Sequence, residues 1–161
     1  MATPTKAQLA TARGFLARAA ARFNGAAAAV ARPNPTDGEF DNNFDGVVTG
    51  IFHVVDAFEL ITTGLRREAR EAEQATRIRS AVLALGQAGV PDVPAATRLV
   101  GLNSRRNTSV HGEWLEVLDP DALLDAIKAG RQLLAAVERY AKDHGIAVSP
   151  PLRSQDVLPP L

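Results

Sequence analysis

Cysteine is absent from the 161 residues, and histidine occurs only three times, at positions 53, 111 and 144. Without cysteine the chain has no disulfide, no thiolate nucleophile and no cysteine-ligated zinc or iron–sulfur site, and a reducing compartment is favoured. The three histidines do not form the closely spaced pairs that build a dedicated metal site. We therefore expect neither a metal nor a cofactor.

An excess of charge is also absent, because 18 Lys and Arg residues balance 18 Asp and Glu residues. A neutral chain does not coat nucleic acid through bulk charge, so any recognition of phosphate must come from a local group of basic side chains. The best candidate is the group formed by Arg98, Arg105 and Arg106.

Long apolar runs are missing as well. No window approaches the roughly 18 to 20 uninterrupted apolar residues of a membrane span, and the opening MATPTKAQL has no apolar centre of the secretory type. We expect a cytoplasmic protein without membrane contact. The length suits one domain with a sizeable core, which we place at residues 1–145. Residues 146–161 are rich in proline and are expected to form an extended tail.

Apolar residues recur at helical spacing along most of the chain, whereas an alternating strand pattern is not found. A capping-box pattern at Thr5 and Gln8 predicts a first helix that reaches about Ala31, and a loop follows over 32–38. Further helices are predicted over 40–63, over 76–87, after Pro94, and from Pro120 to Asp143 with Gly145 as terminator. The pattern predicts an all-α fold of four or five helices in an up-down bundle.

The predicted helix over 40–63 is apolar almost all round. Such a helix lies at the centre of a bundle or is shared with a second subunit, and Gly46 and Gly50 would let another backbone approach it closely. Because a lone four-helix bundle has little surface to cover so many apolar side chains, we expect a two-fold dimer.

The stretch from Ala95 to Trp114, AATRLVGLNSRRNTSVHGEW, begins as an apolar-periodic helix and becomes polar and basic in its second half. Asn103, Asn107 and His111 fall four residues apart on one stripe. Arg106 lies about 100° to one side of that stripe. An amide, an imidazole and a guanidinium are thus presented together.

The segment Arg106-Asn107-Thr-Ser-Val-His111 resembles the motif of the HEPN superfamily. In that motif an arginine, a polar residue directly after it, and a histidine after four to six intervening residues, here four, lie on a late helix. The resemblance implies a small all-α domain over about residues 5–145. It further implies a metal-independent endoribonuclease that acts as a homodimer, with two motif helices facing each other across a cleft. Many such toxins or defence proteins have a nucleotidyltransferase-like antitoxin as partner.

By this resemblance Arg106 would stabilise the phosphate, Asn107 would orient the site and His111 would act as acid or base. An imidazole with a pKa near 6.5 suits proton transfer from a ribose 2′-hydroxyl, and a guanidinium suits two-point binding of phosphate. We add Asn103, Arg105 and Arg98 as RNA-binding residues from their positions on and near the helical stripe.

Other interpretations remain open at this point. The resemblance also covers non-catalytic modules that bind RNA, a nucleotide or a protein partner. In a separate, purely structural interpretation, Arg106 pairs with Glu113 or Glu116 at the surface, and Asn107 and His111 cap the helix end before Gly112. We interpret His53 as a satisfied buried or interfacial side chain, and His144 as a helix-terminal cation. Trp114 is more typical of a core residue than of a base-stacking one.

Overall fold

The computed structural model describes residues 3–32, 37–65, 71–110 and 120–148. Within these ranges the chain forms five helices and no strand, so the predicted all-α class is confirmed. The helices are α1 (Lys6–Val30), α2 (Asp37–Thr63), α3 (Glu71–Gln87), α4 (Ala96–Val110) and α5 (Pro120–Asp143). The α2 helix begins three residues before the predicted start, because the apolar pattern begins only at Phe40.

The helix ends follow from local chemistry. Thr5 and Gln8 form the expected capping box, in which the Gln8 amide donates to Thr5 Oγ1 and the Thr5 amide donates to Gln8 Oε1. The side chain of Gln8 also donates to the carbonyl of Gly64 at 2.7 Å and so links the start of α1 to the end of α2. Gly145 has a φ of 69° and ends α5, as predicted.

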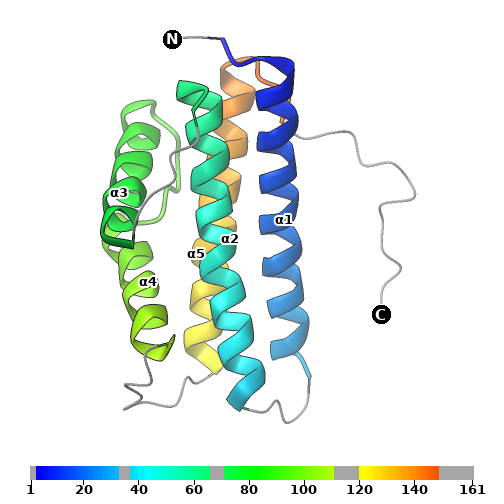
Figure 1. Cartoon of the computed structure of the whole chain (residues 1–161), viewed down its shortest axis with the longest axis vertical. Coiled ribbons are helices and arrows are strands. Elements are labelled where there is room, and N and C mark those ends of the chain that lie inside the picture. The colour runs from blue at the N-terminus through cyan, green and yellow to red at the C-terminus, as the bar shows by residue number, and fades with distance from the viewer. Residues whose placement is uncertain (1–2, 33–36, 66–70, 111–119, 149–161) are drawn as a thin grey trace, which may run out of the picture.

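Three long helices, α1, α2 and α5, run side by side along the molecule, and α3 and α4 together cover the other side of α2 (Figure 1). The two shorter helices follow each other along α2, with α3 beside its upper half and α4 beside its lower half. Figure 1 also shows that α2 and α5 both start at the lower end, so the helices do not alternate strictly in direction as the up-down prediction requires. The alternation fails between α2 and α3, which both run upward in that view, and α4 then returns the chain to the lower end before α5 begins.

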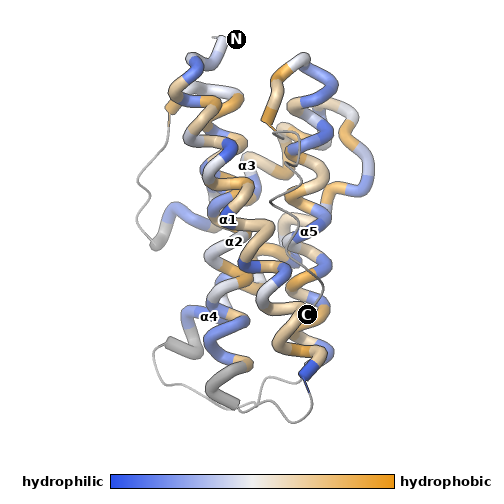
Figure 2. Tube along the Cα trace, turned by 90° about the vertical axis from the view of Figure 1, so that its right-hand side faces the viewer, coloured by the Kyte–Doolittle hydropathy of each residue, from blue (hydrophilic) through white to orange (hydrophobic). Residues whose placement is uncertain are grey.

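The core lies where α1, α2 and α5 meet. The ring of Phe23 is buried between two glycines: a Cβ on Gly50 would lie 2.8 Å from it, and a Cβ on Gly130 only 2.5 Å. Figure 2 shows apolar positions, in orange, along these helices. Gly50 therefore serves contact between helices of one chain, which was one of the two alternatives predicted for it.

The apolar side chains of α2 are all covered within a single chain. Those described from Phe40 to Ile61 are at most 8% exposed. Helices α1 and α5 cover one side of α2, whereas α3 and α4 cover the other. The prediction that a second subunit is needed to cover α2 is therefore wrong. A dimer has to be supported on other grounds.

The first residues of the predicted tail pack back onto the helices. Val148 is buried, Ile146 lies against the core, and the guanidinium of Arg13 on α1 donates to the carbonyl of Ala147. The remainder of the tail, residues 149–161, lies outside the described residues.

Candidate functional site

The α4 helix carries the described part of the motif, residues 106–110, and it begins at Ala96, two residues after the predicted start signal at Pro94. Leu99, Asn103 and Arg106 follow each other at the i, i+4, i+7 spacing of one helical face. Leu99 is buried, Asn103 is buried, and Arg106 is half-buried. The face that an ordinary helix would fill with apolar residues therefore becomes polar from its second turn, as the blue stretch of α4 in Figure 2 shows.

Arg106 points at α2. Its Nε atom lies 2.9 Å from Oδ1 of Asp45, with side-chain exposures of 28% and 49% for the two partners. The same Nε is buried and makes no hydrogen bond within the described residues, because its N–H is not aimed at the carboxylate. The contact is therefore an attraction between charges, in which the Nε–H is not directed at the carboxylate.

Asn103 lies one turn before Arg106 on the same face. Its side chain is among the few buried polar groups, with 5% of the residue exposed, and its Oδ1 accepts no hydrogen bond from any described residue. An unmet buried acceptor costs about 1–3 kcal/mol. Oδ1 of Asn103 is thus an unmet buried acceptor one turn from a guanidinium whose Nε bonds to no described residue, which suits a ligand that has both hydroxyl and anionic groups.

The other predicted motif residues have different positions. Asn107 is half-buried, whereas Arg105 is exposed. Their neighbour in the motif, His111, lies outside the described residues, as do Trp114 and the two glutamates considered as partners of Arg106. The structure brings Asn103, Arg106 and Asn107 to one helix and places Asp45 opposite them.

Arg98 is directed to α5. Its Nη2 lies 3.1 Å from a carboxylate oxygen of Asp125 and donates to the Asp125 carbonyl at 3.0 Å, while Nη1 is 3.4 Å from Oε1 of Gln132. The three arginines grouped in the sequence thus have separate surroundings: Arg98 joins α4 to α5, Arg105 is exposed, and Arg106 meets α2.

A second arginine cluster was not predicted. Arg77 on α3 donates from Nε and Nη2 to both carboxylate oxygens of Glu59, at 2.9 and 2.6 Å, and from Nη2 to Asp56 at 2.5 Å. Its side chain is 9% exposed, and those of Asp56 and Glu59 are 8% and 17% exposed. The bonds with Glu59 and Asp56 raise the pKa of Arg77 above its ordinary value, although burial opposes this.

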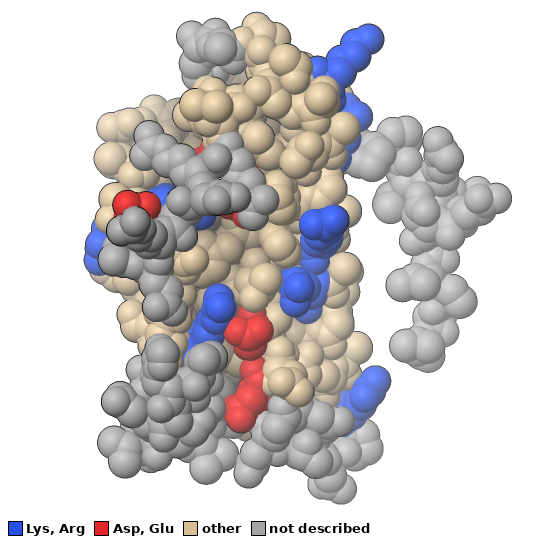
Figure 3. All heavy atoms as spheres, in the orientation of Figure 1, with Lys and Arg blue, Asp and Glu red and all other residues tan. Residues whose placement is uncertain are grey.

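A signal for this cluster is present in the sequence. Two acidic residues three positions apart on an otherwise apolar helix require a basic partner if that helix is central. At about 100° per residue, Asp45, Asp56 and Glu59 fall within about 60° of one another. These three residues form the acidic face of α2, against which α3 and α4 each place one arginine. Figure 3 shows acidic and basic side chains adjoining in the lower half of the molecule.

The remaining histidines have local roles. The ring of His53 is half-buried and stacks on Phe15, with ring centroids 5.4 Å apart. His144 follows the last turn of α5, where its Nδ1 lies 2.8 Å from the carbonyl of Tyr140 and its ring stacks on Tyr140. The position of His144 fits its interpretation as a helix-terminal residue. His53 is half-buried as expected, but its Nδ1 is a buried nitrogen that forms no hydrogen bond with a described residue, so this side chain is not fully satisfied.

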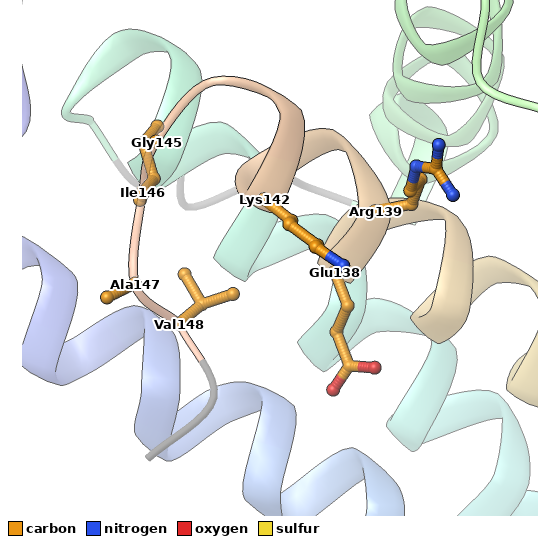
Figure 4. A pocket seen from close by; sticks show the side chains of 7 residues that line it. All are labelled: Glu138, Arg139, Lys142, Gly145, Ile146, Ala147 and Val148. Atoms are coloured by element: carbon orange, nitrogen blue, oxygen red, sulfur yellow. The ribbon is translucent and has the colours of Figure 1, made fainter. Parts of the chain in front are cut away.

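Three surface cavities lined by described residues lie away from α4. One of about 580 Å³ is bounded by the end of α5 and residues 145–148 (Figure 4). In that view Arg139 is directed away from the other lining residues, and it pairs with Asp143 at 3.0 Å. Cavities of about 390 and 290 Å³ lie on α1 and between α2 and α3.

The described ranges hold neither a metal-binding cluster nor a membrane-spanning helix. No three His, Asp or Glu side chains within them cluster closely enough to hold a metal ion. None of the described helices has both the length and the apolar character needed to cross a membrane.

No protein-family model, no curated protein and no solved structure matches the chain.

Proposed function

We propose that the chain is a metal-independent endoribonuclease of the HEPN type, with the motif on α4 as its active site. The observation that supports this most is the polar face of α4, where Nε of Arg106 and Oδ1 of Asn103 form no hydrogen bond with any described residue. A ribose hydroxyl can donate a hydrogen bond to Oδ1 of Asn103, and a phosphate oxygen can accept one from the guanidinium of Arg106.

The reaction follows from the chemistry of these groups. His111 takes the proton of a ribose 2′-hydroxyl, and the 2′-oxygen attacks the adjacent phosphorus. The bond from phosphorus to the 5′-oxygen of the next nucleotide breaks, and that oxygen takes up a proton. The products are a 2′,3′-cyclic phosphate and a 5′-hydroxyl. Arg106 stabilises the charge on the phosphate oxygens, and Asn107 orients the groups. DNA is not cleaved because it has no 2′-hydroxyl.

The resemblance also supports a homodimer in which a second copy of α4 completes the cleft. The bundle arrangement, a role as toxin or defence component, a cytoplasmic location and a nucleotidyltransferase-like antitoxin belong to the same proposal. Arg105 and Arg98 would contact RNA outside the reacting phosphate.

A non-catalytic binding module is the second candidate. The ion pair of Arg106 with Asp45 favours it, because a guanidinium that already faces a carboxylate has a structural reason to be there. Such a module would bind RNA, a nucleotide or a protein partner without breaking a bond.

RNA cleavage by the purified full chain in EDTA separates these candidates. The parent protein should give products that end in a 2′,3′-cyclic phosphate, and His111→Ala should slow cleavage by about 10² to 10⁴ while RNA affinity stays nearly unchanged. Arg139→Ala, a substitution in an exposed ion pair on α5, is the matched control and should cleave like the parent.

Cleavage that needs magnesium or manganese would overturn the mechanism. RNA binding without cleavage by the parent, with affinity lost in Arg106→Ala, would establish the binding module instead.

A further inference from the structure

Asp45 differs from the other two members of the acidic face of α2. Asp56 and Glu59 share a buried arginine whose Nε and Nη2 atoms donate to them in good geometry. Asp45 is 49% exposed, and the basic partner that the described residues give it is Arg106, at a single nitrogen. One carboxylate is therefore placed near the motif arginine without being bonded to it in the forked manner seen at Arg77.

Asp45 faces one edge of the Arg106 guanidinium, and this determines which N–H groups are left to bind a ligand. A guanidinium can form two parallel hydrogen bonds through its Nε edge or through its terminal Nη edge. Asp45 lies at Nε. The terminal edge is then the one through which Arg106 binds a phosphate at two points, and the attraction of Asp45 fixes the direction in which that edge faces.

We infer that Asp45 is a positioning residue for Arg106. This inference rests on the proposed function, since it assigns to Arg106 the phosphate of RNA. The carboxylate holds the guanidinium against α2 and restricts the rotation of a long side chain, so that the phosphate contact is formed without further ordering.

The negative charge of Asp45 also has an opposing effect. A carboxylate close to the bound phosphate repels it, so the charge weakens the binding of RNA while it improves the orientation of Arg106. Removing the charge should therefore change binding and turnover in opposite directions. A residue that only stabilises the fold would not produce this split, because loss of folded protein lowers both.

The test compares Asp45→Asn with Asp45→Glu and with Asp41→Asn, a neutralisation one turn earlier on α2. Single-turnover cleavage and RNA affinity are measured on the full chain. Asp45→Asn should cleave about 10-fold to 100-fold more slowly and bind RNA as well as the parent or more tightly. Asp45→Glu should recover part of the rate, and Asp41→Asn should behave like the parent.

A second measurement keeps this inference separate from the proposed function. The Nε–H resonance of Arg106, followed by NMR in the absence of RNA, should exchange with solvent faster in Asp45→Asn than in the parent. Unchanged exchange, or cleavage at the parental rate by Asp45→Asn, would overturn the inference. Faster exchange in a protein whose parent form does not cleave RNA would support the positioning and overturn the proposed function.

Discussion

The two sides of α2 are held by different forces. Toward α1 and α5 the contact is apolar and close, with Phe23 inserted between Gly50 and Gly130. Toward α3 and α4 the acidic face of α2 meets one arginine from each helix. The packing of α2 against α1 and α5 depends on shape, so an atom added there should destabilise the fold. The side toward α3 and α4 depends on paired charges, and its two arginines are paired to different degrees.

The difference between these arginines indicates separate roles. Arg77 is buried and donates three hydrogen bonds to two carboxylates, so these donors stabilise the fold. Arg106 is partly exposed and is held at one nitrogen without an aligned hydrogen bond. A buried, forked ion pair holds elements of the fold together, whereas a partly exposed arginine without an aligned hydrogen bond to its partner is suited to bind an anionic ligand.

The largest expected loss of stability follows from removing Arg77. Arg77→Ala leaves two poorly exposed carboxylates without their cation and should lower the free energy of unfolding by about 3–5 kcal/mol. Urea denaturation followed by circular dichroism measures this. The control is Arg139→Ala, whose exposed pair should contribute less than about 0.5 kcal/mol. Equal effects of the two substitutions would contradict the structural role of Arg77.

A smaller loss is expected on the apolar side of α2. Gly130→Ala places a Cβ where the ring of Phe23 lies and should cost about 1–3 kcal/mol of unfolding free energy through overpacking. Gly101→Ala is the matched substitution in α4, where a Cβ meets nothing within 4 Å, and should stabilise by about 0.5–1 kcal/mol. Thermal melts of both variants check this, and a stabilising Gly130→Ala would show that the packing is looser than described.

The smallest effect concerns pH. The pKa of Arg77 is raised in the folded state, so its contribution is fully present below the unfolded pKa and is lost only as pH rises through the folded pKa. Both pKa values lie well above the pH range of ordinary stability measurements. The difference in unfolding free energy between the parent and Arg77→Ala should therefore be the same at pH 7 and pH 10. A difference that shrinks over this range would point to a group other than Arg77.

Much of the fold could be predicted because its signals are local. The capping pair Thr5 and Gln8, Pro94 and Gly145 each mark a helix end by their own chemistry, and the structure places helix ends there. The cover of α2 could not be predicted in the same way. Spacing shows that a helix is apolar all round, but it does not show whether the same chain or another supplies the cover.

The candidate site was predictable only along α4. Helical spacing brought Asn103, Arg106 and Asn107 together, because residues three and four apart share a face. The partners of these arginines lie on other helices, at sequence separations that no local pattern encodes. Asp45 for Arg106, Asp125 for Arg98, and Glu59 for Arg77 are all of this kind.

The central claim is that Arg106 serves a ligand while Arg77 serves the fold, and the most direct test is one paired measurement on Arg106→Ala. Its unfolding free energy and its rate of RNA cleavage in EDTA are compared with those of the parent. We expect stability to fall by less than about 1 kcal/mol, because the pair with Asp45 is partly exposed and lacks an aligned hydrogen bond, and cleavage to fall by about 100-fold to 1000-fold. A folded Arg106→Ala protein that cleaves RNA at the parental rate would contradict the claim.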